Sequence, residues 1–307
     1  MHQKDKENRP QISMEALYEA AGISRQGFHN WLRPSALELI RTPEKLVIEM
    51  AQHVRKAFLP GSSAREVYFY IRKKHKDYNY LLLGWGKHSF EALCLVNGLR
   101  IETKRFVPKT TIRGEYVFSN LIEGLQIDDI NRIWVSDICY VYGSNGQLVG
   151  YATSLIDVYS RLLLGLSFSI SMHATVTSQE VLKQAFETRN ITHFENLIFH
   201  SDGGKQYIEK IFLDALRSRN ISSSMADNCY ENAFAESFND ILKNHMLFDI
   251  NINSFVQLKQ HEKFIKNCYN QNRNHSGILN LTPIEFEQHI LTLQQCQRTS
   301  LNIKVIT

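Results

Sequence analysis

Two aspartates stand in or directly after apolar runs of strand type, where an unpaired carboxylate is costly. Asp137 interrupts the run WVSDICYV, and Asp202 ends the run LIFHSD immediately before two glycines. Each residue alone has a simpler explanation, because Asp-Gly-Gly is ordinary turn chemistry and an aspartate can face outward from an edge strand. If both carboxylates point into one site, they need a cation beside them.

A third acid, Glu236, lies on a predicted helix, where a lone glutamate is commonly a solvated side chain. Lys243 follows seven residues later, two turns along the same side of that helix. Three hard oxygen ligands suit Mg²⁺ or Mn²⁺, and Lys243 could hold a phosphate beside them. Two such ions, about 3.5–4 Å apart, would activate an attacking oxygen and stabilise a leaving one in phosphoryl transfer. The apolar face of the helix consists of Ala233, Phe234, Phe238, Ile241 and Leu242.

Alternation of apolar and polar residues predicts the elements that must position these acids. Helices are expected at 176–189, at 206–218 and from about 230. Strands are expected at 132–142, 148–160, 161–170, 195–200 and 221–225. Three strands joined by short turns, followed by alternation of strands and helices, indicate a mixed five-stranded sheet flanked by helices, an α/β fold. In this order the fourth strand can lie beside the first, which would bring Asp202 to Asp137.

The front half of the chain predicts small all-α modules. Residues 13–33 have the pattern of a helix-turn-helix, with a turn at Ala21-Gly22-Ile23 and a second helix capped by Ser24. Further helices are expected at 43–58, 63–76 and 87–97. A plain helical hairpin and a solvated basic face are the simpler interpretations. The side chains that would contact DNA are Arg25, Gln26, His29 and Asn30 of the first module and Arg72, Lys73 and Lys74 of the second.

The distribution of charged, apolar and cysteine residues indicates which kinds of molecule the protein can bind. The 307 residues carry a formal net charge of +4, but residues 1–114 hold 20 basic and 11 acidic side chains, and residues 115–307 hold 15 and 20. A basic front half suits a phosphate backbone, although charge alone also fits a mildly basic solvated surface. No apolar run reaches the length of a membrane span and no signal-peptide region opens the chain, so we expect no membrane and a cytoplasmic location. The five cysteines lack zinc-site spacing.

Five motifs taken together resemble the OrfB-type DDE transposases of bacterial insertion sequences, a copy-out and paste-in group within the retroviral integrase superfamily. The resemblance covers about residues 120–290. It implies an RNase H-like fold, a catalytic and metal-binding triad at Asp137, Asp202 and Glu236, and two Mg²⁺ or Mn²⁺ ions. The motifs are WVSDICYV, DVYSR, HSDGGKQY, SMADNCYENAFAESFNDILK and YNQNRNHSGILNLTPIEF.

The resemblance also assigns DNA contacts and structural positions. Lys243 matches a basic residue of the family that contacts DNA, and Asn232 matches a position near the active site. The DVYSR motif, with Asp157 and Arg161, is interpreted as structural. The interval from Asp202 to Glu236 is two residues shorter than is usual in the family, and the missing pair falls in a loop that is commonly basic. The remaining candidate DNA contacts are Lys205, Arg273 and His275.

These observations predict a transposase that binds terminal inverted repeats, nicks DNA and joins the 3′-OH to a new phosphodiester of target DNA. A dimer or larger homo-oligomer on paired ends is expected, in a bacterial cytoplasm. An RNase H-fold nuclease that only hydrolyses and a non-catalytic DNA-binding regulator are the alternatives. The expected domains are a helix-turn-helix (1–36), a second helical module (37–102), a linker (103–125), the catalytic core (126–290) and a C-terminal tail (291–307).

Overall fold

The computed structural model describes residues 41–74, 81–100, 118–171, 175–226, 232–247 and 250–303, together with scattered residues between 15 and 27. Its centre is a five-stranded sheet of order β4-β3-β2-β5-β6. The first three strands are antiparallel neighbours, whereas β5 runs parallel to β2 and β6 parallel to β5. The strands are β2 (Ile133–Tyr142), β3 (Leu148–Asp157), β4 (Leu163–Ser169), β5 (Leu197–Ser201) and β6 (Ile221–Met225).

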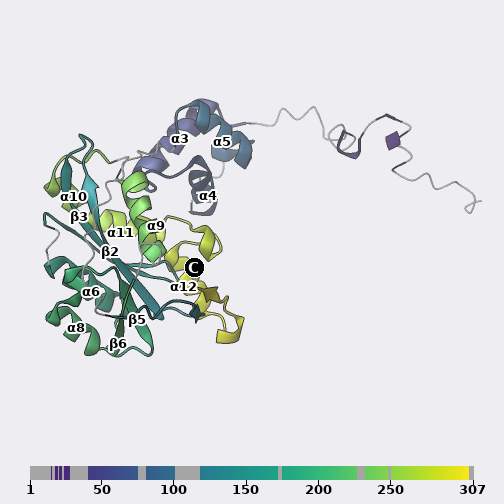
Figure 1. Ribbon diagram of the computed structural model, residues 1–307. Coiled ribbons are helices and arrows are strands. Elements are labelled where there is room, and N and C mark those ends of the chain that lie inside the picture. The colour runs from purple at the N-terminus through teal and green to yellow at the C-terminus, as the bar shows by residue number, and fades with distance from the viewer. Residues whose placement is uncertain are drawn as a thin grey trace, which may run out of the picture.

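Helices cover both faces of this sheet (Figure 1). One face packs against α9 (Ala233–Asp240), the π-helical continuation η3 (Ile241–Met246), α10 (Phe255–Gln260) and α11 (Glu262–Gln271). The other face packs against α6 (Thr175–Arg189), α7 (Lys205–Ile208) and α8 (Lys210–Arg217). The central strand β2 therefore has apolar side chains on both faces, with Val135 in one core and Trp134 in the other. The predicted mixed sheet flanked by helices is confirmed, and its strand order is that of the expected RNase H-like fold.

Side chains of the helices cap the outer edge of β4. The amide of Asn270 donates to the Leu163 carbonyl and accepts from its N–H, both at 2.9 Å. Gln184 makes the same pair of bonds with Leu166, at 3.1 and 3.0 Å. An open strand edge is a template for pairing with another chain, and these two amides occupy its hydrogen-bonding groups.

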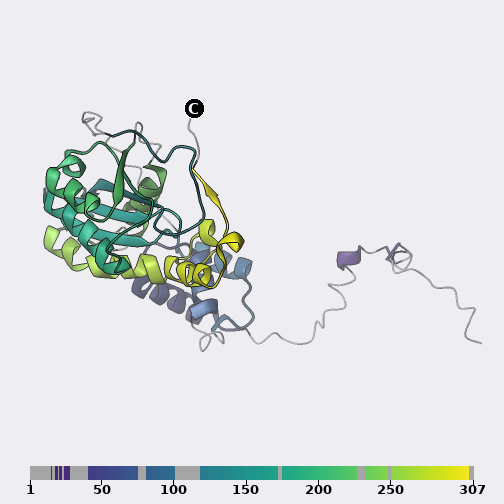
Figure 2. The ribbon, with the colours of Figure 1, turned by 90° about the horizontal axis from the view of Figure 1, so that it is seen from below.

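A small helical module stands before the core and consists of α3 (Glu44–Ala57), α4 (Ala64–Lys74) and α5 (Lys87–Val96). Its apolar side chains form a core of their own, with Val47, Ile71 and Phe90 almost completely buried. Figure 2 shows the module beside α12 (Pro283–Leu291) of the catalytic half. The three helices predicted in this region are confirmed, each within two residues of its expected ends.

The module is docked on the core through backbone approach and charge pairs. Gly61 has φ +69°, and a Cβ there would lie 1.9 Å from the carbonyl oxygen of His245, so only glycine allows this approach. The imidazole Nδ1 of His245 donates to the Gly61 carbonyl at 3.0 Å. Glu66 of α4 pairs with Arg273 at 3.2 Å. The core and the module therefore share polar contacts from several separate segments.

The end of the chain returns to the start of the core. Strand β7 (Leu301–Asn302) pairs antiparallel with β1 (Gln126–Ile127), and the N–H of Ile303 donates to the Leu125 carbonyl at 2.8 Å. Arg298 pairs with Asp129 at 2.5 Å. The described residues of the expected C-terminal tail, up to residue 303, thus pack on the core that they follow.

Part of the predicted helix-turn-helix lies among the described residues. Gly22 has φ +64°, as the predicted turn requires, and the hydroxyl of Ser24 accepts from the N–H of Gly27 at 3.0 Å, as the predicted cap requires. Arg25 and Gln26 are exposed on this helical turn, whereas His29 and Asn30 lie outside the described residues.

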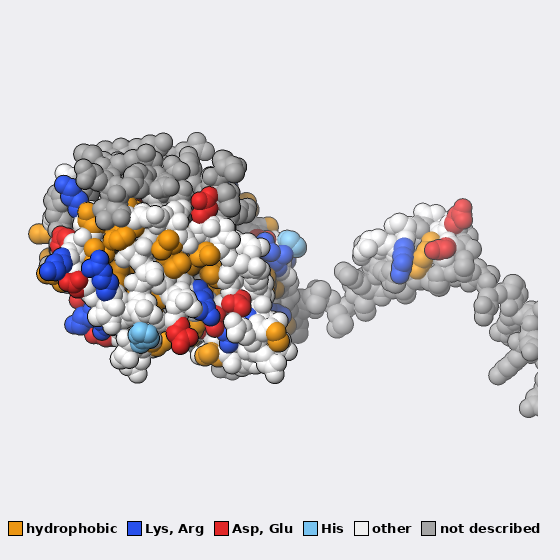
Figure 3. Space-filling view, turned by 60° about the horizontal axis from the view of Figure 1, so that its bottom comes forward, with side chains coloured by type: hydrophobic (Ala, Val, Ile, Leu, Met, Phe, Trp, Pro, Cys, Tyr) orange, Lys and Arg blue, Asp and Glu red, His pale blue; other side chains and the backbone are white. Residues whose placement is uncertain are grey.

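The surface in Figure 3 has mixed charge, because basic and acidic side chains are interspersed there around a central group of hydrophobic ones. None of the helices in the described ranges is long and apolar enough to cross a membrane.

Candidate active site

Asp137 and Asp202 come together at the point where the pairing between the parallel strands β2 and β5 ends. The last paired residues of β2 and β5 are Ser136 and Ser201, and each aspartate is the next residue along its strand. Asp137 continues β2 opposite Ser154 of β3, and Asp202 directly follows β5. Both carboxylates are half-buried. The predicted adjacency of the first and fourth strands is confirmed, and it places the two acids side by side.

The three acids influence one another electrostatically. The pKa of Asp137 is raised to about 7, first by burial and then by the negative charges of Asp202 and Glu236. Burial also raises the pKa of Asp202, although the N–H of Gly204 offsets part of this effect. The pKa of the exposed Glu236 is raised by partial burial and lowered by Lys243. Burial is thus the first cause of the raised pKa at all three acids, and Asp137 also experiences the negative charges of the other two.

Helix α9 carries Glu236 and faces β2 with a stripe of amides. Asn239, three residues after Glu236, donates from Nδ2 to Oδ2 of Asp137 at 2.7 Å. Asn232, four residues before Glu236, donates to the carbonyl of Ser136 at 3.1 Å. Both amides are about 5% exposed or less, and the Oδ1 atom of each has no partner among the described residues. These bonds fix α9, and hence Glu236, relative to the strand that bears Asp137.

Asn239 was not among the sequence-predicted site residues, although its signal is present in the spacing. Residues 232, 236 and 239 are separated by four and three positions, so they share one side of a helix. A hydrophobic pattern alone gives no reason to single out a polar residue on the inner side.

Hydroxyl groups support β2 from the opposite face. The Ser136 hydroxyl donates to the Ser154 carbonyl at 2.7 Å and lies 2.8 Å from the hydroxyl of Tyr207 in α7. Tyr207 is 3% exposed, and its pKa is raised well above 10 by burial and by Asp202 and Asp137. The phenol is therefore neutral and acts as a hydrogen-bonding support.

The two glycines after Asp202 adopt backbone conformations that other residues could also adopt. Neither Gly203 nor Gly204 adopts a positive φ, and Gly204 has φ −63°. A Cβ on Gly204 would instead lie 2.3 Å from the Gln206 amide and 3.1 Å from Oδ1 of Asp202. Neither glycine is therefore required by a left-handed backbone conformation, and at Gly204 the small residue leaves room for the Asp202 carboxylate.

Two predicted DNA contacts lie exposed near the acids. Lys243, in η3, is exposed on the segment that continues α9, and its charge acts on both Asp137 and Glu236. Lys205 begins α7, three residues after Asp202, and is also exposed. Both positions are compatible with contact to a bound strand of DNA.

The structure gives other predicted DNA contacts protein partners. Lys73 donates to Glu285 of α12, and Lys74 pairs with the same carboxylate at 3.2 Å. Arg273 is 8% exposed and pairs with Glu66. These three cations hold the helical module on the core, and Arg273 in particular is not on an open surface.

His275 and Arg72 are likewise accounted for by contacts within the molecule. His275 stacks edge-on against Tyr269, with 4.7 Å between ring centroids. Burial, together with Arg273 and Arg161, lowers the pKa of His275 to about 3, so it carries no charge at neutral pH. Arg72 is exposed and lies 6.0 Å from the ring of Tyr68. His275 is therefore a neutral, packed side chain, and its contact with DNA stays a prediction.

The DVYSR motif forms a buried charge network that shares no hydrogen bond or ion pair with the three acids among the described residues. Asp157 is fully buried and pairs with Arg189 at 2.9 Å, which also binds Glu287 of α12 at 2.6 Å. The backbone N–H groups of residues 131, 159 and 160 donate to the same aspartate. Asp157 therefore ties the β3–β4 turn to α6 and α12.

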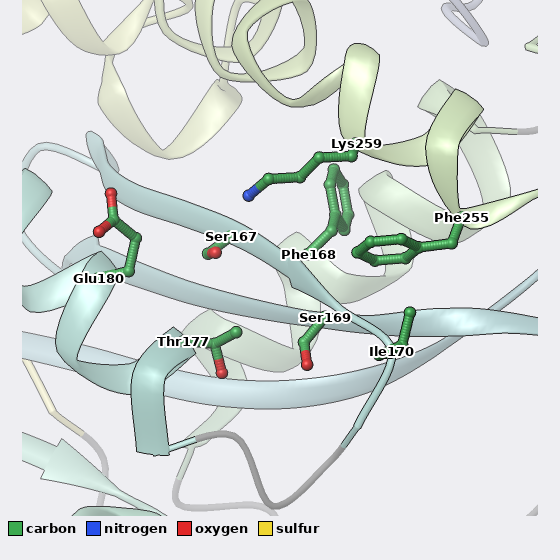
Figure 4. A pocket seen from close by; sticks show the side chains of 8 residues that line it. All are labelled: Ser167, Phe168, Ser169, Ile170, Thr177, Glu180, Phe255 and Lys259. Atoms are coloured by element: carbon green, nitrogen blue, oxygen red, sulfur yellow. The ribbon is translucent and has the colours of Figure 1, made fainter.

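A pocket of about 380 Å³ lies at the end of β4 and does not include the acids. Figure 4 shows that Glu180 and Lys259 project toward it from different helices, beside the rings of Phe168 and Phe255. Lys259 already pairs with Glu262 at 2.6 Å. The pocket is thus a feature separate from the candidate active site.

Two models of the integrase core domain match this chain, at residues 129–229 and 219–283, which together span half of its length and all three acids. The chain belongs to the DDE transposases of the integrase superfamily. Two curated relatives support the assignment. The transposase for insertion sequence element IS904 of Lactococcus lactis is 32% identical over 162 residues, which are 52% of this chain and 62% of that protein. The insertion element IS600 uncharacterized 31 kDa protein of Shigella sonnei is 27% identical over 275 residues, 87% of this chain and 96% of that protein.

Solved structures of the superfamily show a distant likeness. The HTLV-2 integrase catalytic core domain in complex with magnesium is 18% identical, with a TM-score of 0.40, covering 52% of this chain and 97% of that one. The simian T-cell lymphotropic virus intasome in complex with the PP2A regulatory subunit B56 gamma is 15% identical, with a TM-score of 0.42, covering 73% and 74%.

The donor set of this integrase core fits a hard divalent cation. Carboxylate oxygens are the ligands that Mg²⁺ and Mn²⁺ prefer. The raised pKa of Asp137 reflects burial first and then the charges of Asp202 and Glu236, and a bound cation would offset both effects. The described residues contain no group of three or more acidic, histidine or cysteine side chains already gathered at metal-binding separation. Asp137 and Asp202 thus form a pair set by the sheet, and Glu236 on α9 is the more exposed third member.

Proposed function

We propose that this chain is a divalent-metal-dependent polynucleotidyl transferase that cuts DNA at the ends of a mobile element and joins the freed 3′-OH to a new phosphodiester. The observation that carries the proposal is the pairing of Asp137 and Asp202 at the ends of adjoining parallel strands, within electrostatic reach of Glu236. Membership of the integrase superfamily and the name of the IS904 relative support it.

In this proposal Asp137, Asp202 and Glu236 would hold Mg²⁺ or Mn²⁺, as two ions. Such ions, when bound, supply activation of the attacking oxygen and stabilisation of the leaving oxygen. Asn239 restrains the Oδ2 atom of Asp137 through its hydrogen bond. Lys243 supplies a positive charge beside the acids, where a DNA phosphate would otherwise be repelled.

The same proposal assigns the partners. Double-stranded DNA, both terminal inverted repeats and target, is the substrate, and Arg25, Gln26, His29 and Asn30 of the first module read the repeats. Joining two ends requires two active sites acting together, so a dimer or larger homo-oligomer assembles on DNA. A DNA substrate places the protein with the bacterial nucleoid in the cytoplasm.

The test is Asp202→Asn, measured on a duplex with a pre-cut end and a free 3′-OH in Mg²⁺. The Gly204 N–H donates to Asp202 Oδ1 at 3.3 Å, and asparagine retains this acceptor, so the turn and the fold should persist. Strand transfer should fall to background, and calorimetry should show weakened Mn²⁺ binding. Asp214→Asn, on the exposed face of α8, is the matched control and should match the parent.

Strand transfer by Asp202→Asn within a few-fold of the parent would exclude the metal-binding role. A parent protein that nicks DNA but never joins ends would instead be a hydrolase with the same acids. A parent that binds DNA without cutting or joining it would be a regulator.

A further inference from the structure

Arg161 is a partly buried cation whose guanidinium contacts no carboxylate among the described residues. It follows the turn between β3 and β4 and is half-buried. Its backbone N–H donates to the Asp157 carbonyl at 2.9 Å, whereas its guanidinium makes no hydrogen bond or ion pair with any described residue. The Asp157 carboxylate, four residues earlier, is engaged by Arg189 and backbone N–H groups. Burial lowers the pKa of Arg161 to about 10, against the smaller effects of Tyr269 and Asp157. A partly desolvated charge that nothing neutralises is costly, so a role outside packing is needed to explain it.

The backbone at Arg161 adds to that cost. Its φ is +63°, in the left-handed region that favours glycine and asparagine. Seven non-glycine residues in the described part of the chain have positive φ; five of them are asparagine, and the others are Arg161 and Leu279. A long charged side chain in this conformation indicates that the side chain itself is required.

The guanidinium is held in a fixed orientation beside α9. It stacks on the ring of Phe234, with 4.0 Å from Cζ to the ring centroid. Phe234 lies in the first turn of α9, two residues or about 3 Å of helix rise before Glu236. A Cβ on Gly277 would lie 3.7 Å from Arg161 Nη2, at ordinary van der Waals contact, so Gly277 lies beside the guanidinium. None of the guanidinium nitrogens of Arg161 is among the fully buried unpartnered atoms, which leaves them accessible.

The neighbouring basic groups do not compete for an anion. Arg273 is neutralised by Glu66, and His275 is uncharged at neutral pH. The positive charge that remains uncompensated in this cluster is that of Arg161.

We propose that Arg161 is a binding subsite for a DNA phosphodiester, beside the first turn of the helix that carries Glu236. The planar guanidinium offers two parallel N–H donors to phosphate oxygens, and its stack on Phe234 prepares that geometry. The positive end of the α9 dipole favours the same anion. This inference rests on the proposed DNA-joining function and replaces the structural role that the sequence assigned to Arg161.

The experiment compares Arg161→Gly, Arg161→Gln and Arg161→Lys in the full chain, with Arg219→Gln as the matched control. Arg219 also stacks on a phenylalanine, at 3.9 Å from the ring of Phe186, but belongs to the opposite face of the sheet. Binding to a duplex of arbitrary sequence is measured over a range of salt concentrations, because a phosphate contact is independent of sequence.

Arg161→Gly should fold with an equal or higher melting temperature, because glycine relieves the positive φ. Its DNA affinity and that of Arg161→Gln should fall about tenfold, and the slope of log affinity against log salt should decrease by about 0.9. Arg161→Lys should retain the salt slope with lower affinity, and Arg219→Gln should match the parent.

Parental affinity and salt slope in both Arg161→Gly and Arg161→Gln would overturn the subsite while leaving the proposed function intact. An equal loss in Arg219→Gln would also overturn it, since the effect would then be general. A parent chain that fails to bind DNA would reject the proposed function itself.

Discussion

Replacing Glu285 by glutamine should weaken the attachment of the helical module to the core at neutral pH. Glu285 lies at the third position of α12 and accepts hydrogen bonds from Lys73, from the Thr282 N–H and from Lys74. Burial alone would raise its pKa, but these bonds lower it from 4.5 to about 2. Glutamine can still complete the capping box with Thr282, so the substitution removes the charge pairs and retains the cap.

The magnitude follows from that pKa. The pKa of Glu285 falls from 4.5 to about 2, and at about 1.36 kcal/mol per pKa unit this sets an upper bound of about 3.4 kcal/mol on the free energy of unfolding contributed by its charge. The side chains of Lys73 and Lys74 are 36% and 34% exposed, so water screens the pairs and about 1–2 kcal/mol is expected. Glu49→Gln is the control, because its pair with Lys45 is long, at 4.0 Å, and exposed, and should contribute less than about 0.5 kcal/mol.

Urea unfolding of the parent and of Glu285→Gln from pH 7 downward provides the assay. The folded pKa is lower than the unfolded one, so the stabilisation is complete above pH 4.5 and is lost as the pH falls toward about 2. The two proteins should differ at pH 7 and converge across that interval. Equal stability at pH 7, or a difference that stays constant down to pH 3, would refute the assignment of this stabilisation to the Glu285 charge.

Three further outcomes are expected. Asn239→Ala should lower strand transfer by about 10- to 100-fold through loss of its bond to Asp137, with unchanged DNA binding, and parental transfer rates would contradict this role. Gly165→Ala should cost about 1–3 kcal/mol in urea unfolding, since its Cβ would lie 2.4 Å from the Val181 carbonyl oxygen, and an unchanged midpoint would show that α6 can move aside. In the parent, the melting temperature should fall as the pH drops from 6.5 to about 3, because His275 binds a proton in the unfolded chain but stays neutral when buried. His275→Phe should make this fall smaller, and an unchanged fall would show that the acid sensitivity arises from other groups.

Local patterns in the sequence were sufficient for the elements and for the acidic pair. An aspartate within WVSDICYV is conspicuous because every neighbour favours a buried strand, and the order of strands and helices limits which strand can lie beside it. The Ser24 cap and the Gly22 turn were also predictable, since both depend on residues within a few positions of each other. Hydrogen bonding and backbone conformation of this kind are determined locally.

Tertiary structure alone decided the partners of the charged side chains. Lys73 has the same local sequence signature whether it binds a phosphate or Glu285, which is 212 residues away. Arg273 and Glu66 are similarly distant along the chain, and their pairing depends on how the module docks. Arg161 is the opposite case. The sequence places it in a motif interpreted as structural, and only the fold shows that no carboxylate pairs with its guanidinium. Charge and polarity are properties of a residue, whereas the group that satisfies them is set by which distant segments the fold brings within a few ångströms.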